Sequence, residues 1–163
     1  MLIERLSSAH DRSLFDCGEP SLNTYLRQYA LQNDKKGLGR TFVALEPGNP
    51  RIYGYYTLST GAVTFDKVPQ NLPRCPVPVA HLGRLAVDLS LRGTGARLGE
   101  TLLLDALRRA VGISEQIGLY AVEVWALNAS ARDFYLKYGF AALLDDENHL
   151  YLPMKSVRKL KLL

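Results

Sequence analysis

Glycine and arginine are concentrated between Arg92 and Gly99, after a short apolar run and before a leucine-rich segment with helical spacing. Where a strand passes into a helix, the first backbone N–H groups of the helix are exposed, and the helix dipole adds partial positive charge. Glycines let this backbone approach a ligand closely, and arginines add full charges. We therefore predict a pyrophosphate cradle made of Arg92, Gly93, Thr94, Gly95, Ala96, Arg97, Leu98 and Gly99.

The glycine stretch spells neither of the two best-known phosphate-binding motifs. The GxGxxG pattern of dinucleotide-binding folds is absent, and so is the GxxxxGK[ST] pattern of P-loops. A glycine-rich loop with solvated arginines is the alternative interpretation of the same residues.

The size and charge of the chain are ordinary for a soluble globular protein. Its 163 residues fit a single domain, residues 1–163, that is large enough for a hydrophobic core. The formal net charge of +4 and the isoelectric point of about 9.1 are compatible with an anionic ligand or a nucleic acid, but they demand neither.

The cysteines and the lack of targeting signals indicate the cellular compartment. Cys17 and Cys75 belong to no CxxC or Cys/His cluster, so we expect no metal site, although the sequence leaves a disulfide between them open. Residues 1–15 lack the apolar core of a signal peptide, and no apolar run approaches the ~20 residues of a membrane span. We expect a reduced, cytoplasmic protein with no membrane association.

The spacing of apolar residues predicts the elements that would position the cradle. Strands are expected at residues 1–6, 40–47, 51–65, 79–88 and 119–127, with a hairpin turn at 48–50 and a proline-rich loop at 66–78. A helix should begin near Pro20 and end at Gly37 and Gly39, with one buried face made of Leu22, Tyr25, Leu26, Tyr29 and Ala30.

The second half of the chain alternates helix and strand. A long helix is expected from about residue 95 to 117, and a shorter helix begins after Asn128 as N-cap and ends at Gly139. A hairpin at 141–154 and a short helix in the basic tail, 155–163, complete the pattern. This order predicts an α/β or α+β fold with one central mixed sheet, in which the two strands around the long helix are parallel.

The phosphate turn of the GNAT acetyltransferases is a third motif, and it resembles the glycine stretch. Its pattern, (Arg/Gln)-x-x-Gly-x-(Gly/Ala), lies between the fourth strand and the next helix and holds the pyrophosphate of acetyl-CoA. Arg92 and Gly95 match the pattern, whereas Arg97 stands where a small residue is usual. Two extra residues also separate the strand from the helix.

Further blocks resemble one subgroup, the GNAT toxins of bacterial toxin–antitoxin pairs. The blocks are residues 15–30, 53–59, 81–88, 120–140 and 150–157, and they occur in the order of that family. A single block would be weak, but the ordered set is specific.

This resemblance implies a fold, an activity and partners. The family fold is a mixed, mostly antiparallel sheet flanked by helices and splayed between its fourth and fifth strands, with acetyl-CoA in the gap. Family members transfer the acetyl group to the α-amino group of an aminoacyl-tRNA and so block translation. They are typically encoded with a ribbon-helix-helix antitoxin, and many form homodimers.

The resemblance also assigns roles to single residues. Tyr135 matches a tyrosine whose implied role is that of a general acid, which protonates the CoA thiolate as it leaves; a structural, half-buried tyrosine is the alternative. Asn128 would contact the pantetheine arm, besides capping its helix. The segment Leu85, Ala86 and Val87 would offer backbone groups to pantetheine and to the thioester carbonyl.

No residue stands out as a general base. Asp88, Glu123 and His81 are candidates by residue type alone. An α-amino group has a pKa of about 7.7–8.0, so much of it is neutral near physiological pH and a water relay could suffice.

The basic residues are candidates for tRNA binding, with ordinary solvated charge as the alternative for each. Arg84 is favoured because it follows the segment HLG, residues 81–83, at the edge of the strand expected at the active site. The others are Lys35, Lys36, Arg40, Arg108, Arg109, Lys155, Arg158, Lys159 and Lys161.

Two other functions stay open at this point. The acceptor of an acetyltransferase could instead be a small amine, a peptide or a protein. Because Arg97 and the two extra residues depart from the family turn, the chain could also be a non-catalytic module that binds CoA or RNA.

Overall fold

The structure is a computed structural model that describes residues 1–160. Its elements, in chain order, are β1 (Leu2–Arg5), α1 (Pro20–Thr24), a π-helical segment (Tyr25–Tyr29), α2 (Ala30–Lys35), β2 (Arg40–Leu45), β3 (Gly54–Val63), a 3-10 turn (Phe65–Lys67), β4 (Val77–Val87), a second 3-10 turn (Leu89–Leu91), α3 (Leu98–Ser114), β5 (Ala121–Trp125), α4 (Ala129–Lys137), β6 (Ala141–Ala142), β7 (His149–Pro153) and α5 (Met154–Lys159).

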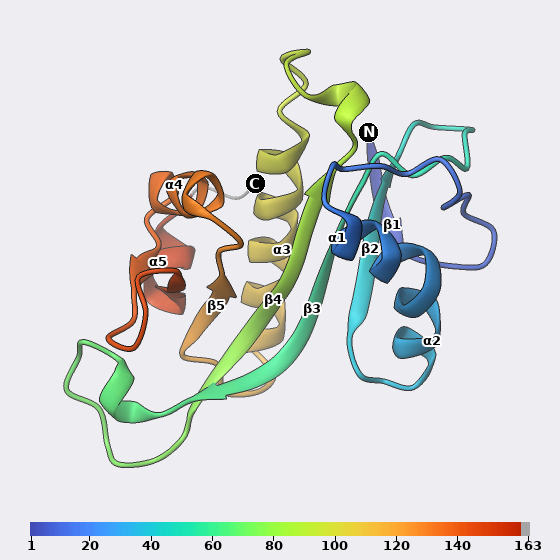
Figure 1. The fold of residues 1–163 in the computed structure, drawn as a ribbon. Coiled ribbons are helices and arrows are strands. Elements are labelled where there is room, and N and C mark those ends of the chain that lie inside the picture. Colours follow the sequence, from blue (N-terminus) through green and yellow to red (C-terminus); the bar gives the residue numbers. More distant parts are fainter. Residues whose placement is uncertain (161–163) are drawn as a thin grey trace. The chain divides into compact units, whose positions relative to one another are not determined.

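The strands form one seven-stranded mixed sheet in the order β1-β2-β3-β4-β5-β7-β6. Strand β4 pairs with β5 in parallel, from Val79 opposite Ala121 to Leu82 opposite Val124. Four neighbouring pairs, β1–β2, β2–β3, β5–β7 and β6–β7, are antiparallel. The predicted mixed, mostly antiparallel sheet and the parallel pair around the long helix are therefore confirmed. Figure 1 shows β3 and β4 as two long neighbouring strands.

The chain divides into two compact units, and β3, β4 and α3 each contribute residues to both. The first unit comprises Met1–Ser59 and Gly83–Ala106. Its core joins residues of the N-terminal loop, the first helical segments and β2 and β3, among them Phe15, Leu26, Val43, Ile52 and Tyr55. Helix α2 contacts β2, and Figure 1 shows α1 and α2 beside the first strands.

The first helical region is interrupted by a π-helical turn, which corrects one sequence expectation. The N–H of Ala30 bonds to the carbonyl of Tyr25, five residues earlier, so one extra residue is inserted into the helix. Leu26 and Ala30 remain buried, but Tyr29 is turned outward and is 46% exposed. The prediction that Tyr29 belongs to the buried face was wrong because it assumed a constant period of 3.6 residues.

The second unit comprises Thr60–Leu82 and the described residues from Leu107 onward. Its core includes Val63, Val79, Ala121, Leu143 and Tyr151. Strand β5 pairs with β4 and with β7, so it occupies the central position that its apolar run predicts. Helix α5 begins in the predicted hairpin and contacts β7, and residues 161–163 of the predicted tail helix lie outside the described part.

Helix α3 starts later than its apolar spacing predicts, at Leu98 instead of about residue 95, and ends at Ser114. Gly95 has a φ of +80° and Arg97 a φ of +53°. Because these are left-handed conformations, a right-handed helix can begin only after them. The glycine stretch is consequently a turn in front of the helix.

The cysteines are both reduced: Cys17 is buried and Cys75 is exposed. Within residues 1–160, no helix is both long enough and apolar enough to cross a membrane.

Candidate active site

The glycine turn alternates residues of left-handed conformation with ordinary ones. Gly93, Gly95 and Arg97 have φ values of +74°, +80° and +53°. Such alternation is typical of backbone turns that bind anions. Here the N–H groups of Thr94 and Ala96 donate within the turn, to the carbonyl of Leu91 and to the hydroxyl of Thr94. Their chain neighbours aside, no atom of the described residues lies within 4 Å of a Cβ built on Gly93 or on Gly95. The turn thus leaves open space beside its backbone, at the N-terminal end of α3.

Thr94 and Ala96 stabilise the turn from within. The hydroxyl of Thr94 donates to the carbonyl of Leu91 at 2.7 Å, and it accepts from the N–H of Ala96 at 3.3 Å. The side chain of Thr94 therefore holds the turn in shape, and its own N–H donates to the carbonyl of Leu91 at 3.4 Å.

The two arginines of the turn differ in their surroundings. Arg97 forms an ion pair with Glu100 at 2.8 Å, in the first turn of α3. Glu100 would otherwise oppose an anion at this helix end, so the pair offsets an unfavourable charge. Arg92 is exposed, and its Nη1 lies 3.8 Å from the Cβ position of Gly18. Leu98 is buried and Gly99 half-buried as the helix begins.

The last residues of β4 present their backbone groups to different edges. The carbonyl oxygen of Ala86 lies 3.1 Å from the Cβ position of Gly54, so it faces β3. Because backbone groups alternate along a strand, those of Leu85 and Val87 face the opposite edge. Leu85 and Val87 thus remain candidates for binding a ligand through their backbone. The Ala86 carbonyl does not, because it faces the neighbouring strand β3.

Tyr135 lies in α4 with a buried ring, 6% exposed, against two phenylalanines. The ring centroids of Phe134 and Phe140 lie 5.2 Å and 5.4 Å away, both at edge-to-face angles. Burial raises the pKa of the Tyr135 phenol well above its usual value. Its hydroxyl makes no hydrogen bond to any residue within 1–160. The bond to the backbone that a purely structural tyrosine would make is therefore not observed.

Asn128 has the predicted capping role. Its side-chain oxygen accepts from the N–H of Ala131 at 2.9 Å, at the start of α4. Gly139 follows the helix with a φ of +96°, as expected for a residue that ends it.

Among the three candidates for a general base, Asp88 has a structural role. One of its oxygens accepts from the N–H of Ser90 at 2.9 Å and the other from the N–H of Asp16 at 3.0 Å. Burial raises the pKa of Asp88, but these bonds outweigh it and lower the pKa. A carboxylate held this way ties the end of β4 to the N-terminal loop.

The other two candidates, His81 and Glu123, are joined in a chain that sequence reasoning missed. Nδ1 of His81 bonds to Glu123, whose other oxygen lies 2.9 Å from Nε2 of His149. Nδ1 of His149 in turn lies 2.8 Å from Asp145. The four residues come from β4, β5, β7 and the loop before β7.

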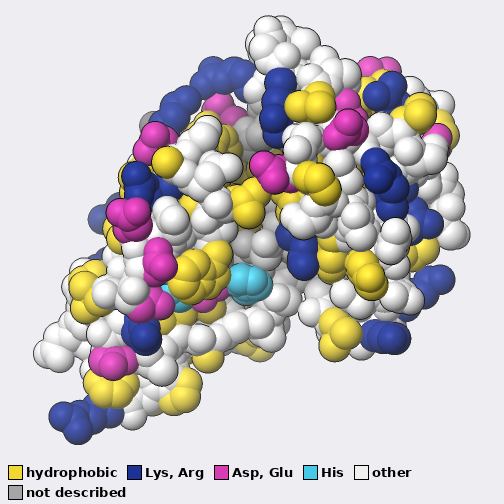
Figure 2. Space-filling model, viewed as in Figure 1, with side chains coloured by type: hydrophobic (Ala, Val, Ile, Leu, Met, Phe, Trp, Pro, Cys, Tyr) yellow, Lys and Arg dark blue, Asp and Glu magenta, His cyan; other side chains and the backbone are white. Residues whose placement is uncertain are grey.

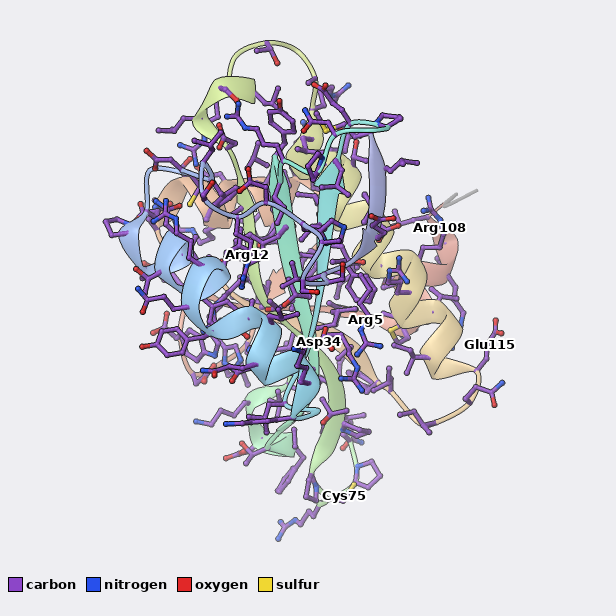
Figure 3. The ribbon with its side chains drawn as sticks, turned by 90° about the vertical axis from the view of Figure 1, so that its right-hand side faces the viewer. Arg5, Arg12, Asp34, Cys75, Arg108 and Glu115 are labelled. Carbon is purple, nitrogen blue, oxygen red and sulfur yellow. The ribbon has the colours of Figure 1, made fainter. Side chains whose placement is uncertain are left out.

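The basic residues predicted to bind tRNA are not equivalent. Lys35, Lys36, Lys155 and Lys159 are exposed. Arg40 bonds to Asp34 at 3.2 Å, and Figure 3 shows Asp34 beside Arg5, its second arginine partner. The Arg84 guanidinium lies 3.5 Å from the centroid of the Tyr25 ring. Arg108 is exposed, Arg109 is half-buried and Arg158 donates to Ser114 at 2.9 Å.

Lys161, the remaining candidate, lies outside the described residues. In Figure 2, lysine and arginine side chains are spread among acidic and apolar ones over the visible face. The view therefore does not reduce the candidates to one basic patch.

Comparison with known proteins identifies related sequences. Residues 3–140 match the model of the family described as "Acetyltransferase (GNAT) family". A protein named "tRNA-acetylating toxin" from Mycobacterium tuberculosis (strain ATCC 25618 / H37Rv) is 44% identical over 160 residues, which cover 96% of this chain and 93% of that protein.

Solved structures show the same fold over nearly the whole chain. A mutant of KacT superposes with a TM-score of 0.89 at 34% identity, covering 97% of both chains. AtaT complexed with acetyl-methionyl-tRNAfMet superposes with a TM-score of 0.88 at 31% identity, covering 96% of both chains. A third structure is a mutant of the AtaT toxin bound to acetyl-CoA and to the C-terminus of the antitoxin AtaR. It has a TM-score of 0.82 and 31% identity and covers 96% of this chain and 95% of that one.

Proposed function

Since the chain belongs to the GNAT acetyltransferase family, we propose that it transfers the acetyl group of acetyl-CoA to the α-amino group of an aminoacyl-tRNA. The observation that carries this proposal is the 44% identity, over 96% of the chain, to a protein named a tRNA-acetylating toxin. The likeness to AtaT in complex with acetyl-methionyl-tRNA supports the same acceptor. Acetylation of the α-amino group would remove the nucleophile that peptide-bond formation needs, so the activity would block translation.

The glycine turn fits the pyrophosphate of acetyl-CoA. The turn contains three left-handed residues, Gly93, Gly95 and Arg97, and the open space beside the two glycines leaves room for phosphate oxygens. The side chain of Arg92 supplies a full positive charge at the start of the turn. We assign the pyrophosphate to the backbone of residues 93–99, with Arg97 mainly engaged by Glu100.

Residues outside the turn would hold the rest of the cosubstrate. The backbone groups of Leu85 and Val87 would bind pantetheine and the thioester carbonyl, which needs donors as its oxygen becomes negative. Asn128 has its side-chain oxygen committed to capping α4, so its amide nitrogen is the group left to contact pantetheine.

Tyr135 would donate a proton to the CoA sulfur as the carbon–sulfur bond breaks. Burial raises the pKa of its phenol, which makes the donation harder than for an exposed tyrosine. Exclusion from water raises the pKa of the CoA thiol as well. The difference between the pKa of the phenol and the pKa of the thiol therefore changes less than either pKa does. The lack of a hydrogen-bond partner for the hydroxyl within residues 1–160 agrees with a group that meets its partner in the ligand.

The tRNA would be held by cations that are exposed or half-buried. Lys35 ends α2 and Lys36 follows it, and both are exposed, as are Lys155 and Lys159. Arg40 and Arg84 are already engaged by Asp34 and by the ring of Tyr25, so they would contribute through a charge that is held in place. Contacts of this kind to phosphates would make binding depend strongly on salt.

The activity would be that of the toxin in a toxin–antitoxin pair. A structure of AtaT with the C-terminus of its antitoxin AtaR supports a protein partner of this type. Following the family pattern, we propose a ribbon-helix-helix antitoxin, a homodimeric toxin and action in the cytoplasm.

The experiment that tests the proposal mixes the purified protein with radiolabelled acetyl-CoA and a bulk pool of charged tRNA. Uncharged tRNA and small amines serve as parallel acceptors. Label on charged tRNA alone would support aminoacyl-tRNA as the acceptor. Label on the small amines would mean that the acceptor is another amine. Binding of acetyl-CoA without any transfer would instead make the chain a non-catalytic module.

A further inference from the structure

His81, Glu123, His149 and Asp145 form a continuous hydrogen-bonded chain across three strands of the second unit. Residues 81 and 123 are direct partners in the parallel β4–β5 pair, and β5 pairs with β7, which carries residue 149. Glu123 and His149 are buried, whereas the side chain of His81 is 34% exposed. The ring of Trp125 stacks on that of His149, with centroids 4.0 Å apart and an angle of 10°. One end of the chain is thus fixed in the fold and the other reaches solvent.

The hydrogen bonds determine where the protons are. A carboxylate can only accept, so each ring nitrogen that faces one must carry a proton. His149 faces Glu123 with one nitrogen and Asp145 with the other, so carboxylates engage both of its ring nitrogens. His81 faces Glu123 with Nδ1 alone. Its neutral form is held as the Nδ1–H tautomer, which leaves a lone pair on Nε2.

The hydrogen bonds of the chain lower the pKa values of its two carboxylates. Burial raises the pKa of Glu123, but the hydrogen bonds and charges of His81 and His149 lower it below its usual value, so this buried carboxylate is ionised. Burial likewise raises the pKa of Asp145, and the bond to His149 outweighs it and lowers the pKa. Glu123 therefore accepts from Nδ1 of His81, and Nε2 is the ring nitrogen left to exchange protons.

The two strands that flank β4 place a glycine and a carboxylate beside His81. From β3, the neighbour is Gly61, whose Cβ position lies 3.5 Å from the Cβ of His81. From β5, only Glu123 faces the imidazole, with His149 and Asp145 behind it. Lys67 acts on Asp145, at the far end of the chain. Within residues 1–160, no hydrogen bond engages Nε2 of His81.

We propose that His81 is the general base of the acetyl transfer, with Glu123, His149 and Asp145 as positioning residues that fix its tautomer. The inference rests on the proposed function, because it needs an amine as acceptor. The lone pair of the amine nitrogen forms the new C–N bond, and one N–H proton passes to Nε2 of His81. The C–S bond breaks with its electron pair on sulfur, which takes a proton from Tyr135. His81 then releases its proton to water, and water restores that of Tyr135, so the net transfer is from nitrogen to sulfur.

The kinetic test replaces His81 by asparagine. In His81→Asn the amide keeps an N–H donor for Glu123 but removes the nitrogen that would accept the proton. We expect kcat/KM to fall by about 100-fold or more, the usual contribution of a positioned base. The loss should be largest at the higher pH values, because only a neutral imidazole can accept the proton from the amine. The acceptors are a charged tRNA pool and, separately, an amino-acid amide, over a range of pH.

The matched control is His10→Gln, which removes a histidine of the first unit that bonds to Glu4. It should leave both kcat/KM and its pH profile unchanged. Binding of acetyl-CoA by calorimetry should be unaffected in either variant. Wild-type rates in His81→Asn at every pH would overturn the base role while leaving the acetyltransferase intact. Wild-type protein that binds acetyl-CoA but acetylates neither acceptor would overturn the proposed function, and the base role with it.

A second readout is independent of turnover. Nitrogen-15 NMR of the histidine rings reports which nitrogen carries the proton, and His81→Asn identifies the signals of that residue. We expect a protonated Nδ1 and an unprotonated Nε2 for neutral His81, and a loss of this preference in Glu123→Gln. A protonated Nε2 on neutral His81 in the wild-type protein would contradict the proposal, because no lone pair would be available there.

Discussion

Gly54 of β3 lies so close to Leu102 of α3 that a side chain at position 54 has no room. A Cβ built on Gly54 would be 2.9 Å from Cδ1 of Leu102 and 3.0 Å from Cδ2 of Leu98. On its other side it would be 3.1 Å from the carbonyl oxygen of Ala86. The missing side chain allows the helix that follows the glycine turn to approach the sheet at the end of β4.

We expect Gly54→Ala to destabilise the protein by about 1–3 kcal/mol, the usual cost of an overfilled core. The side chains of Leu98 and Leu102 could move slightly to make room. The Ala86 carbonyl could not move, because it belongs to a strand that is paired in the sheet. The measurement is the free energy of unfolding in urea. The control is Gly118→Ala, since none of the described residues other than its neighbours comes within 4 Å of that Cβ position. Equal stability of the two variants would show that α3 is not held against β3 as described.

A buried carboxylate, Asp34, predicts a pH dependence of stability. Asp34 accepts from Arg5 and Arg40 and from the N–H of Thr41 at 3.2 Å. Burial raises its pKa, but these partners outweigh it and lower the pKa below the usual value. The stabilisation is therefore complete above the unfolded-state pKa of about 3.9 and is lost as the pH falls through the lower folded-state value.

In Asp34→Asn we expect a loss of about 1–2 kcal/mol at pH 7, because the ionised acceptor is removed. The difference from the wild-type protein should shrink as the pH falls below about 4, because the unfolded wild-type chain then binds a proton that the folded carboxylate still resists. Urea unfolding of both proteins between pH 3 and pH 7 measures this difference. A constant difference across that range would contradict the assignment to ionised Asp34.

The periodicity of apolar residues was sufficient to predict the elements and their order. It failed where the local geometry departs from an average helix. The π-helical turn turned Tyr29 outward, and the left-handed Gly95 and Arg97 delayed the start of α3. Single residues with unusual backbone angles leave little trace in a pattern of apolar spacing.

The site was only partly predictable for a different reason. The glycine turn and Tyr135 lie in contiguous motifs, so the sequence displays them directly. The four residues of the His81–Asp145 chain come from separate segments, and their meeting depends on the register of three strands. The one available signal was Glu123, a charged residue within an otherwise apolar strand. A buried charge requires a partner, but the sequence does not say which.

The proposed general acid predicts the behaviour of Tyr135→Phe. The ring keeps its contacts with Phe134 and Phe140, and the lost hydroxyl has no partner within residues 1–160, so stability should change little. We expect kcat to fall by about 100-fold or more, with acetyl-CoA binding unchanged. Tyr138→Phe, in the turn that ends α4, is the matched control and should retain activity. Full activity of Tyr135→Phe would leave the tyrosine a packing role only.

The last prediction concerns the pyrophosphate cradle, for which the chain offers a closely matched pair of glycines. Gly95 and Gly48 have φ values of +80° and +79°, and around both the Cβ position is open within the described part of the chain. Alanine at either position would meet the same backbone strain, about 1 kcal/mol, so both variants should lose similar stability.

Only Gly95→Ala should weaken acetyl-CoA binding, because its methyl group would occupy space that the phosphate oxygens need. We expect the Kd to rise about tenfold, equivalent to about 1.4 kcal/mol, whereas Gly48→Ala should keep the wild-type value. Isothermal titration of each variant with acetyl-CoA measures the effect. Wild-type affinity in both variants would place the pyrophosphate elsewhere. Equal weakening of both variants would mean that the loss of stability, and not the site, governs binding.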